Sequence, residues 1–78
     1  KPNMVTLCID GGKKSKLRPG DILGALTADG GIPGSDVGKI NMFPNQAYVA
    51  IARPSARLAL KLIQEKNMKG RRFRVRRL

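Results

Sequence analysis

Residues 40–51, INMFPNQAYVAI, decide how this chain is expected to fold. Apolar side chains recur at every second position from Ile40 to Ile51, and Pro44 and Asn45 interrupt them in the middle. A period of two on both sides of a Pro-Asn pair is typical of two β-strands joined by a turn. The stretch therefore predicts a β-hairpin near the centre of the chain.

A helix is predicted on each side of this hairpin. Pro19 suits the first turn of a helix, and the apolar residues after it have the spacing of one helical face, which predicts a helix over 19–28. The second helix is predicted to begin at Pro54 and to end near Asn67. Residues 29–38 contain four glycines and one proline, which indicates a loop between the first helix and the hairpin.

The two ends of the chain are predicted to supply the first and the fourth strand. Apolar residues alternate with others over residues 4–10, and Phe73 and Val75 alternate with arginines. The order β-α-β-β-α-β is the split βαβ arrangement, an α+β fold with a four-stranded antiparallel sheet and two helices on one face. Because a chain of this length has room for one core, residues 1–78 are expected to form a single domain.

Positive charge is the dominant chemical feature of the chain. Sixteen Lys and Arg residues face five Asp and Glu residues, and the net charge is +11. Ten of the sixteen cations lie in two short windows, which are Lys13, Lys14, Lys16 and Arg18 after the first strand, and Lys69, Arg71, Arg72, Arg74, Arg76 and Arg77 near the C-terminus. An isolated Lys usually serves solubility, but like charges this close together repel, so the clusters predict a polyanionic partner.

Aromatic side chains on the predicted open face of the sheet are few. Tyr48 fits a position at which an RNA-recognition motif stacks a base, and Phe43, near the turn, is a weaker candidate. Binding is therefore expected to depend on cations that contact phosphates, which favours structured RNA over a single strand. The predicted RNA-binding residues are Lys13, Lys14, Lys16, Arg18, Tyr48, Arg72, Arg74 and Arg76.

Several chemistries are excluded by composition. The chain has no histidine and one cysteine, so it has no Cys/His zinc site, no internal disulfide and no imidazole for acid–base catalysis. Cys8 is expected to be a small packing residue. The aspartates at positions 10, 21, 29 and 36 are far apart in the sequence and are expected to be caps or turn residues, namely Asp10, Asp21, Asp29 and Asp36. Residues 12–15 lie where a P-loop would, but Leu7 replaces its first glycine and Lys14 separates the Lys-Ser pair. The backbone of this loop could still hold a phosphate of RNA, because Gly11 and Gly12 let the main chain come close. We predict no catalytic residue, no metal, no cofactor and no membrane span in this chain.

One known family has a similar sequence over nearly the whole chain. The similarity lies in LCIDGGKK at 7–14, LRPGDILGAL at 17–26, DVGKI at 36–40, YVAI at 48–51 and the Lys-Gly…Arg-Val-Arg ending. These segments resemble the C-terminal RNA-binding domain of DbpA-type DEAD-box RNA helicases. The block Arg-Pro-Gly-Asp-Ile is the most specific of them, and the family's basic segment falls on Lys13, Lys14, Lys16 and Arg18.

The resemblance implies an atypical RNA-recognition motif that tethers a bacterial ATP-dependent helicase to 23S rRNA. It implies a target in the hairpin 92 region of the peptidyl transferase centre and a role in assembly of the large ribosomal subunit. The ATP- and Mg-dependent core would lie upstream in the same polypeptide, and Lys1 in place of Met agrees with a piece excised from the C-terminal end of such a helicase. A monomer in the bacterial cytoplasm is expected, and this chain would bind RNA without catalysing a reaction.

Two other functions are compatible with the charge. A stand-alone basic ribosomal or nucleoid protein could coat nucleic acid without choosing a site. A protein-interaction domain could instead dock an acidic partner on its open sheet face or on its first helix.

Overall fold

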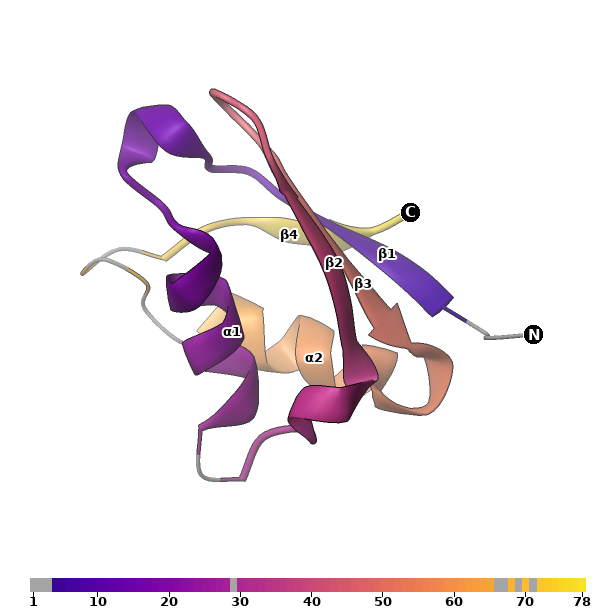
Figure 1. Cartoon of the computed structure of the whole chain (residues 1–78). Helices are drawn as coiled ribbons and strands as arrows, with labels where there is room; N and C mark the ends of the chain where they lie inside the picture. Colours follow the sequence, from indigo (N-terminus) through magenta and orange to yellow (C-terminus); the bar gives the residue numbers. More distant parts are fainter. Residues whose placement is uncertain (1–3, 29, 66–67, 69, 71) are drawn as a thin grey trace.

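Four antiparallel strands pair in the order β2-β3-β1-β4. The computed structural model describes residues 4–28, 30–65, 68, 70 and 72–78. Its elements are β1 (Met4–Ile9), the short 3-10 helix η1 (Lys13–Ser15), α1 (Pro19–Thr27), the 3-10 helix η2 (Gly34–Asp36), β2 (Val37–Met42), β3 (Ala47–Ala52), α2 (Arg53–Glu65) and β4 (Val75–Arg77). Both helices lie on one face of the sheet (Figure 1). The predicted α+β fold with its β-α-β-β-α-β order is confirmed.

Element boundaries differ from the predicted ones by a few residues. β1 and α1 each end one residue early, and α2 begins at Arg53. β2 begins at Val37, inside the predicted loop, because Val37 pairs with Ile51 across a register shift that accommodates one extra residue. The described part of α2 ends at Glu65, and the predicted helix end near Asn67 lies outside the described residues.

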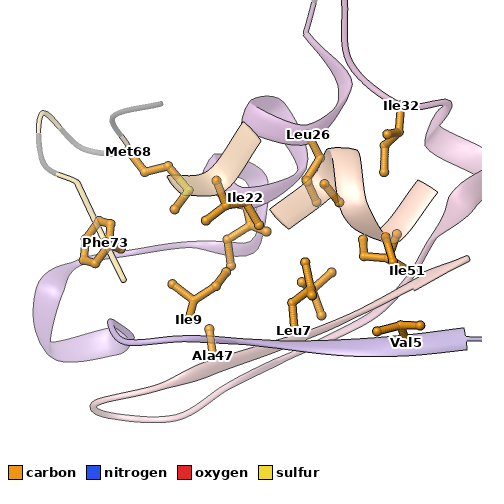
Figure 2. Packing of buried hydrophobic residues seen from close by; sticks show 14 of the residues in the cluster. Val5, Leu7, Ile9, Ile22, Leu26, Ile32, Ala47, Ile51, Met68 and Phe73 are labelled. Atoms are coloured by element: carbon orange, nitrogen blue, oxygen red, sulfur yellow. The ribbon is translucent and has the colours of Figure 1, made fainter. Parts of the chain in front are cut away.

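The core lies between the helices and one face of the sheet. Figure 2 shows Val5, Leu7 and Ile9 extending from β1 toward the helices, of which α1 contributes Ile22 and Leu26. Period two on the strands and the 3.6-residue period on the helices bring these apolar sets together. The buried cluster comprises Val5, Leu7, Ile9, Leu17, Ile22, Leu26, Ile32, Ala47, Val49, Ile51, Ala56, Ala59, Ile63, Met68 and Phe73. Among the described residues, no helix is long and apolar enough to cross a bilayer.

The last strand is shorter than the alternation predicts. β4 begins at Val75, so the prediction that Phe73 belongs to it was wrong. Phe73 is instead a buried core residue, and Figure 2 shows it at one end of the cluster. Its ring lies against Gly11, where an added Cβ would be 2.3 Å from the ring carbon Cδ1. The ring therefore occupies space that any larger residue at position 11 would need.

Two aspartates join neighbouring elements. As predicted, Asp21 caps α1, because its Oδ2 accepts a hydrogen bond at 3.0 Å from the backbone N–H of Arg18. Asp36 was expected to be a cap or turn residue, but its Oδ2 accepts a hydrogen bond at 2.5 Å from the hydroxyl of Ser55. This bond connects η2 to the first turn of α2. Asp29, also expected in a turn, lies outside the described residues.

Candidate nucleic-acid interface

The basic loop, residues 11–18, is held against the turn between β2 and β3. The backbone N–H of Lys13 donates to the Phe43 carbonyl at 2.9 Å, and that of Lys14 donates to the Pro44 carbonyl at 2.9 Å. Figure 1 shows the loop containing η1 beside the tip of the hairpin. Segments about 30 residues apart in sequence are thus connected by backbone hydrogen bonds. These bonds do not depend on the side chains at positions 13 and 14.

Gly12 makes this joint possible. An added Cβ at Gly12 would lie 2.0 Å from the carbonyl oxygen of Phe43 and 2.9 Å from the backbone N of Gln46. Sequence reasoning suggested that Gly11 and Gly12 let the main chain approach a phosphate of RNA. Both glycines are buried, and the close approaches that they permit are to Phe73 and to the hairpin turn, so their role is internal.

The loop also closes on itself. The Gly12 carbonyl accepts hydrogen bonds from the backbone N–H of Ser15 at 3.0 Å and of Leu17 at 3.1 Å, and Leu17 is buried in the core. The loop is therefore fixed at the hairpin by Gly12 and at the core by Leu17. Its four cationic side chains, those of Lys13, Lys14, Lys16 and Arg18, are exposed, as expected for phosphate contacts. A hollow of about 390 Å³ is lined by Lys13, Lys16, Leu17 and Arg18.

Lys16 has a left-handed backbone conformation, with φ 61° and ψ 22°. An L-residue pays about 1 kcal/mol or more for this conformation, whereas glycine adopts it freely. We therefore expect the Lys16→Gly variant to be more stable than the Lys16→Ala variant, with a free energy of unfolding that is higher by about 1 kcal/mol. Both variants lose the same charge, so both should lower the salt slope of RNA binding by about 1. Urea denaturation and salt titration of the two variants test this, and an alanine variant as stable as the glycine variant would contradict it.

Tyr48 lies on the open face of the sheet. The register aligns Asn41 with Tyr48, Tyr48 with Cys8, and Cys8 with Arg76, so these four residues form one row across all four strands. Tyr48 is half-buried, and its hydroxyl donates a hydrogen bond to Gln46 Oε1 at 3.2 Å. Cys8 is 3% exposed, as expected of a packing residue.

Phe43 packs on Tyr48 from the hairpin turn. The two rings meet edge to face, with centroids 5.6 Å apart and planes at 79°. Phe43 is 49% exposed, and its carbonyl is one of the two that accept hydrogen bonds from the basic loop. The two aromatic candidates named from the sequence thus form one pair, which the sequence did not predict.

The predicted C-terminal arginines do not share one location. Arg74 and Arg76 line a hollow of about 340 Å³ on the open face, together with Cys8, Asp10, Gln46 and Val75. Arg72 precedes β4 and does not line this hollow, but it lines another of about 500 Å³ with Gln64 of α2. Lys69 and Arg71 lie outside the described residues. Arg74 thus lines both hollows, one with Arg76 on the open face and the other with Arg72 beside α2.

Sequence reasoning missed Asp10 and Gln46 as candidate site residues. Asp10 was assigned to a turn, yet its backbone N–H donates to the Arg74 carbonyl at 2.7 Å, which places the two residues opposite each other. Gln46 lines the same hollow and holds the Tyr48 hydroxyl. The alternation in the third strand already assigned Gln46 to the open face, whereas Asp10 was expected to be a cap or turn residue. That signal identifies the face but cannot show that a hollow forms there.

Comparison with known proteins identifies the family of the chain. The family model described as "DbpA RNA binding domain" matches residues 6–77. The chain belongs to the DbpA RNA-binding domain family. It is 55% identical over 73 residues to the ATP-dependent RNA helicase DbpA of Escherichia coli (strain K12), a match that covers 94% of this chain and 16% of the helicase.

More distant relatives bear similar names. The chain is 30% identical to the ATP-dependent RNA helicase DbpA of Bacillus subtilis (strain 168) over 94% of its length, which covers 15% of that protein. It is 31% identical to the ATP-dependent RNA helicase DeaD of Mycobacterium tuberculosis (strain H37Rv) over 90% of its length, which covers 12% of that protein. The chain thus spans less than a fifth of the length of each of these relatives. As a member of the DbpA RNA-binding domain family, it is an RNA-binding module.

Proposed function

We propose that this DbpA RNA-binding domain directs an ATP-dependent RNA helicase to structured 23S rRNA, in the hairpin 92 region of the peptidyl transferase centre, during assembly of the large ribosomal subunit. The helicase core would lie in the same polypeptide and would use ATP and Mg²⁺. The chain would act as a monomer in the bacterial cytoplasm. The names of the relatives, which are ATP-dependent RNA helicases, support the link to a helicase.

The observation that best supports this proposal is the fixed basic loop. Hydrogen bonds to the Phe43 and Pro44 carbonyls and the buried Leu17 hold the loop in place before RNA arrives. A loop whose main chain is fixed in advance avoids the entropic cost of ordering that main chain on binding. Such a loop can match a particular spacing of phosphates, whereas mobile cations would attract any nucleic acid equally.

The open face adds a second contact beside the loop. Tyr48 and Phe43 connect the loop to the hollow that contains Arg74 and Arg76. With one aromatic pair, this surface can stack few bases, so phosphate contacts would dominate the affinity. A folded RNA with an unpaired loop offers both closely spaced phosphates and accessible base edges.

Two RNA hairpins test the proposal. We expect the hairpin 92 fragment of 23S rRNA to bind at least tenfold more tightly than a hairpin of equal length and unrelated sequence at one fixed salt concentration. If about five phosphates are contacted, log affinity should fall with log salt at a slope between about −3.5 and −4.5. Fluorescence anisotropy over a salt series measures both quantities.

The outcomes separate the competing functions. Equal affinity for the two hairpins with a steep salt slope would indicate a nucleic-acid-coating protein instead. A slope near zero would contradict the electrostatic account altogether. The variant Glu65→Gln, at an exposed position on α2, serves as a control for a change in net charge away from the basic loop and the open face.

A further inference from the structure

The outer side of α2 carries cations that belong neither to the basic loop nor to the open face. Arg53, Arg57 and Lys61 recur at intervals of four residues in α2, and all three are exposed. Residues four apart are neighbours on one side of a helix, and each step rises about 6 Å along the axis, so these cations form a row about 12 Å long. We call these three residues the α2 row. It lies in the helical layer, across the sheet from the open face (Figure 1).

Helix stability does not explain the α2 row. Like charges four residues apart repel each other, and Arg53 lies in the first turn, where the helix dipole favours an acid. The first turn of α2 contains no acidic residue. Glu65 follows Lys61 at the same interval, yet no ion pair joins these two residues, both of which the structure describes. The row therefore destabilises the free helix, and a bound polyanion would relieve the repulsion.

A hollow continues the row at the C-terminal end of α2. Gln64 is seven residues after Arg57 and so lies on the same side of the helix. It lines a hollow of about 500 Å³ together with Arg72 and Arg74, which precede β4. Ser55, on the opposite side of α2, donates its hydrogen bond to η2. The α2 row thus faces away from η2 and toward the edge strand β4, where two more arginines extend the positive charge.

The side chains available on this surface suit the phosphates of paired RNA. Proteins that bind single strands stack the bases on aromatic side chains. The chain has three aromatic residues, of which Tyr48 and Phe43 form their pair at the open face and the hairpin turn, and Phe73 is buried. No aromatic side chain is left for the exposed side of α2. Double-helical RNA keeps its bases inside and its phosphates outside, so its binding needs none.

We propose that the α2 row and the adjoining hollow bind the phosphate backbone of a double-helical arm of the RNA, while the basic loop holds the hairpin; the inference rests on the proposed function of RNA binding. Cations on a rigid helix at intervals of about 6 Å are close to the spacing of successive phosphates along one A-form strand. Contacts to phosphates carry no base sequence. This second surface would therefore fix the orientation of the bound RNA and leave the choice of hairpin to the first surface.

Two RNAs test the proposal, namely the hairpin 92 fragment alone and a longer 23S rRNA fragment that adds the neighbouring double-helical segments. We expect the salt slope of the longer fragment to be steeper by about 2 to 3, or about 1 for each cation of the row. Arg57→Gln and Lys61→Gln should each lower that slope by about 1 and weaken binding of the longer fragment by about threefold or more. Binding of the short hairpin should be unchanged. Fluorescence anisotropy over a salt series measures all of these quantities.

Lys39→Gln is the matched control, because it makes the same chemical change as Lys61→Gln at another exposed position. Lys39 lies on β2, at the edge of the sheet opposite to β4. We expect Lys39→Gln to leave the difference between the two RNAs intact. Equal effects of Lys39→Gln and Lys61→Gln on the longer fragment would overturn the proposal. So would an absence of any effect of Arg57→Gln and Lys61→Gln, an outcome that would favour an acidic protein as the partner of the row.

The short hairpin separates failure of this inference from failure of the proposed function. A preference for hairpin 92 over an unrelated hairpin that persists without any gain from the longer fragment would leave the proposed function intact and remove only the site on α2. Loss of that preference would remove the proposed function, and absence of RNA binding would remove both. Glutamine is a good helix former, and Arg57 and Lys61 are exposed, so the variants should fold. Relief of the repulsion should make Arg57→Gln at least as stable as the parent chain in thermal denaturation.

Discussion

Replacement of Gly12 by alanine will detach the basic loop from the β2–β3 turn. The new Cβ would lie 2.0 Å from the Phe43 carbonyl oxygen, and the obstacle is backbone that cannot rotate away. The two hydrogen bonds that Lys13 and Lys14 donate to the turn should be lost with the movement. We expect a loss of about 2–4 kcal/mol in unfolding free energy, from these bonds and from the local strain.

RNA binding should respond to the same substitution in a characteristic way. The charge of the chain is unchanged, so the salt slope should stay nearly the same. The affinity should fall by about tenfold or more, since the loop must then be ordered by the RNA at an entropic cost. A lower affinity with an unchanged salt slope would indicate that the loop is no longer preorganised. A shallower salt slope would instead indicate that phosphate contacts are lost.

Gly24→Ala is the matched control. Gly24 lies within α1, and an added Cβ there would meet no atom within 4 Å. Alanine in a helix interior is better than glycine by about 1 kcal/mol, so this variant should be more stable than the parent chain. Equal stabilities of Gly12→Ala and the parent chain, by thermal and chemical denaturation, would show that the loop is not fixed at the turn.

The second large effect is expected at Leu26. This side chain is 0% exposed on the inner face of α1, whereas Leu23 on the same helix is 41% exposed. Leu26→Ala removes a buried side chain and leaves a cavity, which costs about 2–5 kcal/mol. Leu23→Ala makes the same chemical change on the outer face and should cost well under about 1 kcal/mol.

The consequence for a small domain is substantial. A domain of this size has a total stability of only about 4–12 kcal/mol, so Leu26→Ala removes a large part of it. Each kcal/mol should lower the melting temperature by about 4–8 °C. Calorimetry of the two leucine variants measures the difference, and similar melting temperatures would mean that α1 does not pack on the sheet through Leu26.

Much of the fold was predictable because periodicity reports burial directly. The alternation in β1 and β3 and the helical spacing around Ile22 arise because each of these elements has one face toward the core and another away from it. Phe73 shows the limit of this signal. It alternates with arginines as a strand residue would, but a strand also needs hydrogen-bond partners, and the backbone hydrogen bonds to β1 and Asp10 begin at Arg74, one residue after Phe73.

The candidate site was predictable only in part. The cations of the basic loop were found because charge density is visible in the sequence, and all four are exposed. Their attachment to Phe43 and Pro44 was not, because it depends on backbone groups that every residue carries. The position of Asp10 in the hollow with Arg74 and Arg76 was also missed, because an aspartate after a strand is usually a turn residue.

The sequence by itself determined the order of the elements, the apolar sets that form the core, the excess of positive charge and the family. Each of these follows from the kind and spacing of side chains along one chain. The tertiary structure alone decided which of these groups meet. It fixed the basic loop on the hairpin turn through Gly12, and it placed Asp10 in one hollow with Arg74 and Arg76 and placed Arg72 in another with Arg74. Contacts of this kind join residues that are far apart in the chain, and only strand register and close packing can set them.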